Sequence, residues 1–337
     1  MSARRPLPAL SSLLAASAAA ALLAGCGTTE SSSAAGEGDG TGGTTAAGPV
    51  TVTDARGQEV ELDAPAERVV ALEWAEVEML RTLGADVVGA ADPKGYATWN
   101  DAEPLADDTE DVGFRAEPSV DAIVALEPDL VVLEADGGDA AIRQLEEYVP
   151  VLVTEGSDAS RNLARMREDF RMVAEAVGAT DEADQVLQDL DRSFEEARSQ
   201  IADAGHDGAP FAMADGWMEG SNVAIRMFAE GSLFSDVAEE VGLENGWPRE
   251  GDQVWGLATT DVEGLAPLKD EKDLTFLYSA SDEPDVFAEG LAENAIWRSM
   301  PFMRADRLHQ LDEGTWTFGG PASVEDFLEQ LVEIFGP

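Results

Sequence analysis

The sequence predicts an α/β protein made of two lobes that one long helix joins. Strand and helix patterns alternate over residues 50–158, which is typical of a parallel sheet covered by helices. Residues 180–204 contain neither glycine nor proline, and their apolar residues recur on one helical face. Strand and helix patterns resume after residue 206, so we expect a second sheet in the second lobe.

The first lobe, residues 50–158, is expected to begin with a hairpin that turns at Gly57. Gly84 is expected to end a helix, and the apolar run 129–133 is expected to be a strand covered on both faces. The predicted strands are 51–53, 58–62, 68–72, 87–90, 129–133 and 151–153, and the predicted helices are 77–83, 118–126 and 141–148.

A helical linker, residues 159–205, is predicted between the lobes. We expect a helix over 160–177 to end at Gly178, and Thr180 to cap the next helix. Helix 180–204 spans about 35 Å, the width of a small domain. It is either an ordinary surface helix or a connector, and its central position favours the connector. Its apolar stripe comprises Ala183, Val186, Leu187, Leu190, Phe194, Ala197 and Ile201.

The second lobe, residues 206–337, repeats the mixture of strands and helices with a less regular alternation. Its predicted strands are 211–214, 223–225 and 274–278, and its predicted helices are 233–241, 262–268, 292–300 and 323–334.

The N-terminus has the pattern of an export signal. Arg4 and Arg5 precede a Leu- and Ala-rich stretch, and small residues lead up to Cys26, the only cysteine of the chain. The run from Leu23 to Cys26 resembles the bacterial lipobox, which implies cleavage after residue 25 and a lipid on the Cys26 sulfur. The alternative is an ordinary signal peptide with an incidental cysteine. Residues 26–49 are rich in Ser, Gly and Thr, which predicts a flexible tether.

The charge balance excludes nucleic acid as a partner. The chain has 68 acidic and 21 basic residues and a formal net charge of −47, whereas phosphate binding needs a basic footprint. We therefore expect membrane attachment through the lipid anchor alone. Only two histidines, His206 and His309, are present, which argues against a metal site of nitrogen and sulfur ligands. No nucleophile elbow or Walker motif occurs, so the sequence favours a binding protein over an enzyme.

Tryptophan is the informative aromatic residue here, with seven copies against three tyrosines. Trp297 falls in a helix pattern and is expected in a core. The other six lie at strand ends or in predicted loops, where ligands of parallel sheets bind. These six are Trp74, Trp99, Trp217, Trp247, Trp255 and Trp316.

An ordered set of short motifs resembles the siderophore-binding proteins of ABC transporters, in particular the subfamily that binds ferric hydroxamates such as ferrichrome and ferrioxamines. The resemblance covers about residues 50–335. It implies two Rossmann-like lobes joined by one long rigid helix, the class III periplasmic-binding-protein fold, with the ligand between the lobes. The motifs lie at residues 67–74, 85–92, 111–119, 126–132, 231–234, 245–247, 254–256, 297–302 and 316–321.

The resemblance also implies the site and the partners. The ligand-facing arginine of the family falls on Arg115. The chain would need no cofactor, because the siderophore itself holds the iron. It would be a monomer, and its partners would be an ABC permease and an ATPase. One departure from the pattern is a turn at 136–138 in place of a tyrosine. The aromatic residues carried over are Trp99, Trp247, Trp255, Trp316 and Phe318, with Trp74 and Tyr96 as additions.

Physical chemistry favours a hydroxamate ligand and leaves alternatives open. Arginine and tryptophan supply hydrogen-bond donors and apolar faces, whereas a negatively charged catecholate or citrate complex would need several cations. A cobalamin or haem receptor of the same fold is one alternative. A secreted enzyme or adhesin with two such lobes is another. The alternative for Arg115 is a surface ion pair with one of the many carboxylates.

Overall fold

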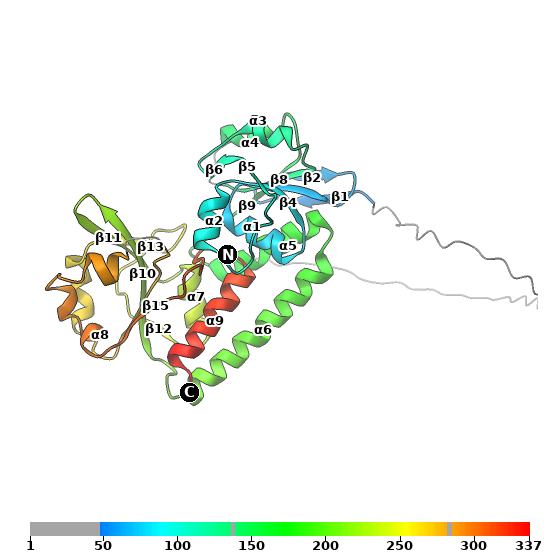
Figure 1. The fold of residues 1–337 in the computed structure, drawn as a ribbon. Coiled ribbons are helices and arrows are strands. Elements are labelled where there is room, and N and C mark those ends of the chain that lie inside the picture. The colour runs from blue at the N-terminus through cyan, green and yellow to red at the C-terminus, as the bar shows by residue number, and fades with distance from the viewer. Residues whose placement is uncertain (1–47, 136–138, 282–284) are drawn as a thin grey trace, which may run out of the picture. The chain divides into compact units, whose positions relative to one another are not determined.

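Two β-sheets organise residues 48–135, 139–281 and 285–337, which are the residues that the computed structural model describes (Figure 1). The predicted signal segment 1–25, Cys26, most of the predicted tether and the turn at 136–138 lie outside these residues. None of the described helices is long and apolar enough to cross a membrane.

The first sheet is parallel throughout, as predicted, in the order β5-β4-β3-β8-β9. Its strand β8 and the neighbouring edge strand β9 are buried along their whole length, which explains their continuous apolar runs. The strands are β3 (Arg68–Ala71), β4 (Asp86–Ala90), β5 (Glu110–Asp111), β8 (Leu130–Glu134) and β9 (Val151–Thr154). The helices between them are α1 (Trp74–Thr82), α2 (Pro93–Trp99), α3 (Val120–Ala125) and α4 (Asp139–Leu145).

Two small hairpins flank this sheet. The predicted one, β1 (Val50–Thr53) with β2 (Glu59–Leu62), turns at Gly57 with φ +73°. The other, β6 (Gly113–Phe114) with β7 (Glu117–Pro118), has two-residue strands that the sequence pattern did not predict. The prediction that Pro118 begins a helix was wrong, because Pro118 belongs to this hairpin. Helix α3 begins at Val120, and the Ser119 side chain caps it by accepting from the Ala122 N–H.

Helices were predicted over 160–177 and 180–204, and the structure has α5 (Asn162–Val177) and α6 (Thr180–Asp203) there. Gly178 ends α5 in the left-handed conformation, as predicted. The prediction for Thr180 was wrong: Ala179 is the N-cap residue and no side chain caps α6. Figure 1 shows α6 running beside the C-terminal helix α9 (Pro321–Phe335), with α1 and α5 near one end. The buried stripe of α6 comprises Ala183, Leu187, Leu190, Phe194, Ala197 and Ile201.

The second sheet is mixed and is built on a long antiparallel hairpin, β10 (Pro210–Glu219) with β11 (Asn222–Phe228). Its order is β13-β11-β10-β14-β15, and a short strand β12 (Glu244–Asn245) also pairs with β10. The hairpin extends well beyond the predicted strands 211–214 and 223–225. The sequence pattern missed its tip because residues there are exposed and show no apolar alternation. The remaining strands are β13 (Leu257–Thr260), β14 (Thr275–Tyr278) and β15 (Leu308–Gln310).

Irregular helical turns surround the second sheet, and two predictions fail there. Segment 262–268 is a 3₁₀ helix, η2 (Glu263–Lys269), with Pro267 inside it. Segment 292–300 is not one helix: the Asn294 side chain accepts from the N–H groups of Ile296 and Trp297, and only a 3₁₀ turn, η4 (Trp297–Ser299), follows. The other helical elements are α7 (Leu233–Glu240), a π-turn η3 (Val286–Gly290) and α8 (Pro301–Arg304).

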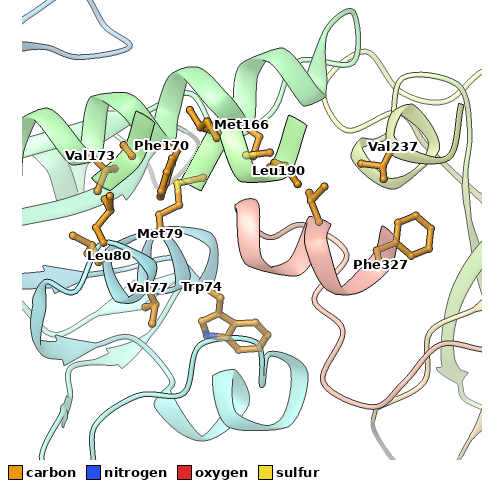
Figure 2. Close-up of a cluster of buried hydrophobic side chains, with 14 of the residues drawn as sticks. Trp74, Val77, Met79, Leu80, Met166, Phe170, Val173, Leu190, Val237 and Phe327 are labelled. Atoms are coloured by element: carbon orange, nitrogen blue, oxygen red, sulfur yellow. The ribbon is translucent and has the colours of Figure 1, made fainter. Parts of the chain in front are cut away.

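One hydrophobic core crosses from the first sheet to the second. Figure 2 shows side chains of α1, α5, α6, α7 and α9 in a single cluster, including Met79, Phe170, Leu190, Val237 and Phe327. Trp297 is fully buried in a separate core behind the second sheet, as its helix-like pattern predicted. We call the first sheet with its helices α1–α4 the first half, and the second sheet with the elements around it the second half. The long helices α5, α6 and α9 bury apolar surface against both halves.

Polar contacts also join the two halves at the start of α5. The Asn162 side-chain amide donates to the Gly231 carbonyl at 2.6 Å, and the Ser157 hydroxyl donates to the Val254 carbonyl at 2.7 Å. Gly231 has φ +86°, and a Cβ atom there would lie 2.1 Å from the Ala159 carbonyl oxygen. Glycine is required at this crossing for both its conformation and its size.

Replacing Gly231 by alanine should therefore destabilise the fold more than the conformation alone explains. The matched control is Gly205→Ala, where φ is +87° and nothing lies within 4 Å of the added Cβ. We expect the control to lower the free energy of unfolding by about 1–2 kcal/mol. Gly231→Ala should lose clearly more, because a backbone carbonyl must move. Urea denaturation of both variants measures this, and equal losses would contradict the close contact.

Candidate functional site

Five aromatic residues that the sequence singled out come together between the two sheets. Trp316 lies at the centre, with ring centroids 4.9 Å from Trp74, 6.4 Å from Trp99 and 5.2 Å from Phe318. Trp255 packs edge-on against Phe318 at 5.5 Å. We call this group, Trp74, Trp99, Trp255, Trp316 and Phe318, the aromatic spine. It joins α1 and α2 of the first half to loops of the second half.

A buried carboxylate holds the loop that carries Trp316 and Phe318. Glu78 of α1 is fully buried, and it accepts hydrogen bonds from the backbone N–H groups of Gly320 and Ser323, both at 2.9 Å. It also accepts from the Ser323 hydroxyl at 2.5 Å and from the Asn100 amide at 2.7 Å. Burial raises the pKa of Glu78, and the four donated hydrogen bonds act in the opposite direction. Glu78 thus caps the N-terminus of α9.

Two glycines allow this carboxylate to approach the loop. A Cβ atom on Gly319 would lie 2.4 Å from a Glu78 carboxylate oxygen, and one on Gly320 would lie 2.9 Å from the Met79 side chain. The Gly-Gly pair after Phe318 is therefore a packing requirement of the site.

Arg115 reaches the aromatic spine from the β6–β7 hairpin. Its guanidinium lies 4.0 Å from the centroid of the Trp74 ring and 5.8 Å from that of Trp316. Its Nη1 also donates to the Glu73 carboxylate at 2.8 Å. Arg115 therefore lies beside the aromatic residues and also forms an ion pair with a carboxylate, so both interpretations of this residue have a counterpart in the structure. The side chain is about one-third exposed, and the bond to Glu73 uses only one of the five N–H groups of the guanidinium.

A second arginine reaches the aromatic spine from the other half, and the sequence reading missed it. Arg226 of β11 lies 5.0 Å from the Phe318 ring centroid and 5.8 Å from that of Trp217. Its Nε donates to both oxygens of Asp215, at 2.9 and 3.2 Å. The two residues are directly opposite each other in the β10–β11 register. The only sequence signal was a charged residue inside an otherwise apolar strand.

The register explains why this ion pair faces the aromatic spine. Side chains alternate between the faces of a strand, so Asp215 shares a face with Met213, and Arg226 shares one with Phe228. Met213 and Phe228 belong to the core that spans both halves, and Phe228 lies 5.7 Å from Phe318. The ion pair therefore lies on the core-facing side of the hairpin, one step closer to its tip than Met213 and Phe228.

Exposed apolar side chains surround the site. Four of the five large hydrophobic residues that are exposed in the described part of the chain neighbour it in sequence: Phe114, Trp217, Met218 and Val254, of which Phe114 is 70% exposed. Phe114 precedes Arg115, Val254 precedes Trp255, and the other two are at the hairpin tip. They leave exposed apolar surface next to Arg115, next to Trp255 and at the tip of the hairpin that carries Arg226.

One buried donor in the site has no partner among the described residues. The indole N–H of Trp316 is inaccessible to solvent and makes no hydrogen bond. Buried indole N–H groups usually find an acceptor. The burial of the Trp316 N–H places it out of reach of a ligand in this arrangement of the side chains.

Two predicted site residues lie outside the aromatic spine. Tyr96 is fully buried, and its hydroxyl donates to the Glu103 carbonyl at 2.5 Å. Trp247 belongs to the separate core behind the second sheet and is 5% exposed, with Arg249 over its ring. Cys26 and the turn at 136–138 are not among the described residues.

A surface groove of about 710 Å³ is lined by Trp247 together with Asp158, Glu230 and Arg249, so one predicted site residue faces a hollow other than the aromatic spine. A surface groove of about 800 Å³ runs along α5, α6 and α7, but its lining contains none of the predicted site residues. No cluster of three or more His, Cys, Asp or Glu side chains in the described residues could hold a metal ion.

A family model described as "Periplasmic binding protein" matches residues 69–315. The chain belongs to the periplasmic binding protein family. The prediction of a binding protein rather than an enzyme is thereby confirmed. The matched region contains Trp74, Trp99 and Trp255 of the aromatic spine, whereas Trp316 and Phe318 lie just beyond it. It also contains the Arg115–Glu73 and Arg226–Asp215 ion pairs.

Relatives of this periplasmic binding protein cover most of its length. The iron(3+)-hydroxamate-binding protein FhuD of Escherichia coli (strain K12) is 28% identical over 269 residues, which cover 80% of this chain and 87% of FhuD. The probable siderophore-binding lipoprotein YfiY of Bacillus subtilis (strain 168) is 22% identical over 296 residues, covering 85% and 87%.

A solved structure confirms the predicted fold class. The Fe3+–Desferal-bound siderophore binding protein FhuD from Vibrio cholerae matches with a TM-score of 0.70 and 23% identity, over 80% of this chain and 99% of that one. At this identity the likeness shows the fold alone. The two α/β lobes and the long helix are those of a class III periplasmic binding protein.

Removing the Glu78 carboxylate should destabilise both the fold and the loop of the aromatic spine. Glu78→Ala leaves two buried backbone N–H groups, a hydroxyl and an amide without their acceptor, so we expect a loss of at least about 2 kcal/mol in unfolding free energy. The exposed Glu195→Ala on α6 is the control and should stay within about 0.5 kcal/mol of wild type. Urea denaturation measures both, and similar values for the two variants would contradict the capping role.

Proposed function

We propose that this protein is the extracytoplasmic solute-binding component of an ABC importer and that it carries a ferric siderophore of the hydroxamate type. The observation that carries the proposal is the aromatic spine with Arg115 stacked on Trp74 at its edge. The ligand would lie between the two sheets, against the spine and the two arginines.

The chemistry of a ferric hydroxamate suits these residues. The siderophore fills the coordination sphere of the iron, so the protein needs to supply donors for oxygen atoms and flat apolar surfaces for the carrier. Unused N–H groups of Arg115 and Arg226 are such donors. The rings of the spine and the exposed side chains around it are such surfaces.

The relatives support the same class of ligand. The Escherichia coli relative is named as an iron(3+)-hydroxamate-binding protein, and the Bacillus subtilis one as a probable siderophore-binding lipoprotein. The ligand residues that we propose are Arg115, Trp74, Trp99, Trp255, Trp316 and Phe318, to which the geometry adds Arg226 and Trp217.

The same proposal covers the organisation of the chain and its partners. We assign residues 50–158 to an N-terminal lobe, 159–205 to the helical linker and 206–337 to a C-terminal lobe. A lipid on Cys26 would anchor the monomer, and residues 26–49 would tether the lobes within reach of a permease and its ATPase. The lipoprotein name of the Bacillus relative supports this arrangement.

Titration with ferrioxamine B, followed by tryptophan fluorescence and calorimetry, tests the ligand. Arg115→Ala should lose about 1.5–3 kcal/mol of binding free energy, or about tenfold to a hundredfold in affinity, because a charge-assisted hydrogen bond is lost. Arg115→Lys should recover only part of this, since the planar fork is absent. The control is Arg192→Ala, which removes an exposed ion-paired arginine on α6.

Binding of cobalamin or haem, and not of ferrioxamine B, would contradict the ligand class. Wild-type affinity in Arg115→Ala would mean that this arginine is only one more ion-paired surface residue.

The anchor is tested by fractionating cells that make Cys26→Ser. Without the sulfur, no lipid can be attached, and the described residues contain no membrane-spanning helix. We expect the variant to be released or to stay unprocessed, while the wild type sediments with membranes. A variant that remains with the membranes as the wild type does would contradict the lipid anchor.

A further inference from the structure

Each of the two arginines of the site already forms an ion pair with a carboxylate, Arg115 with Glu73 and Arg226 with Asp215. We propose that Glu73 and Asp215 determine ligand charge: by neutralising Arg115 and Arg226, they make the site accept neutral or cationic ferric chelates and reject polyanionic ones. This inference rests on the proposed function and deepens it.

The pair on the hairpin has the geometry of a permanent ion pair. The Arg226 guanidinium contacts both oxygens of Asp215, through Nε at 2.9 and 3.2 Å and through Nη2. Asp215 is the more buried partner, with its side chain 11% exposed against 32% for Arg226. Burial raises the pKa of Asp215, and the adjacent guanidinium lowers it. Fork-to-fork contact of this kind is the arrangement in which arginine binds a carboxylate most strongly.

The pair on the first half is built differently but has the same balance of charge. Arg115 donates through Nη1 to Glu73 at 2.8 Å, and its flat face covers Trp74. Glu73 is the N-cap residue of α1, so its backbone is tied to the helix that carries Trp74. The carboxylate is less exposed than the guanidinium, at 17% against 36%. A ligand therefore meets the arginine before it meets the acid.

Both arginines keep their ability to donate hydrogen bonds after this neutralisation. A guanidinium has five N–H groups, and the ion pairs leave part of each fork unused. A hydroxamate or carbonyl oxygen of a neutral or cationic chelate can accept from these groups. A polyanionic chelate would need net positive charge instead, and it would lie beside two carboxylates. The site thus selects by charge through repulsion as well as by contact.

The overall charge of −47 would also disfavour an anionic ligand, so the test must separate local from global charge. The double variant Glu73→Gln/Asp215→Asn removes two negative charges at the site. The matched control Asp189→Asn/Glu293→Gln removes two negative charges from exposed ion pairs elsewhere, Arg192–Asp189 and Arg298–Glu293. The single variant Glu73→Gln, at a partly exposed position, is included in case Asp215→Asn disturbs the hairpin.

The probes are ferrioxamine B, a cationic hydroxamate, and a synthetic trianionic iron(III) tris-catecholate, each titrated into the mature chain. We expect wild type and the control variant to bind only ferrioxamine B well. The site variant should gain at least about tenfold in affinity for the tris-catecholate, and Glu73→Gln alone should gain part of it.

Three outcomes overturn the inference. Equal affinity of wild type for the two chelates, or a gain in the site variants no larger than in the control, removes Glu73 and Asp215 from ligand selection. Wild-type protein that binds neither chelate contradicts the proposed function itself, and the inference with it.

Discussion

The contact between the Glu78 carboxylate and the N-terminus of α9 is the interaction on which the rest of the site depends. It ties the first long helix of the described fold to the last one, and it does so inside the core that both halves share. Placing a carboxylate there is unfavourable unless donors surround it. Four donors surround Glu78, and their hydrogen bonds fix the start of α9 and the loop before it. The positions of Trp316 and Phe318, which lie on this loop, are fixed in the same way.

Everything that reaches the site from elsewhere is placed against those two rings. Trp74 and Arg115 approach from the first sheet, and Trp255, Phe228 and Arg226 approach from the second. The rings of tryptophan and phenylalanine offer broad faces with few rotatable bonds, so little conformational freedom is lost when a ligand covers them. The ion pairs at the edge hold the guanidinium groups within 4.0 Å of the Trp74 centroid and 5.0 Å of the Phe318 centroid. The site is therefore organised by its own contacts.

The sequence predicted the parts of this protein whose signal is local. Continuous apolar runs predicted β8 and β9, and an apolar stripe predicted α6, because burial imposes a period on the residues themselves. The failures have equally physical causes. Asn294 bonds to its own following backbone where a helix was expected, and Pro267 lies inside η2. Trp247 was proposed for the site from its motif and Tyr96 as an addition, and both are buried outside the aromatic spine, because a sequence pattern does not report the direction of a side chain. Arg226 was missed because its partner is identified only by the register of the hairpin.

The β10–β11 hairpin sets a limit on how relatives of this chain can vary. Asp215 and Arg226 meet because they are opposite each other on one face, and side chains switch face with every residue. Inserting or deleting a single residue in either strand would turn one member of the pair to the other side of the sheet. Length changes are compatible with the pair only at the turn around Gly220, which has φ +65° and open space beside it. The number of residues between the tip and the ion pair is therefore fixed. Homologous chains that keep the pair can lengthen the tip, but between the tip and the pair they can differ only in which side chains they carry.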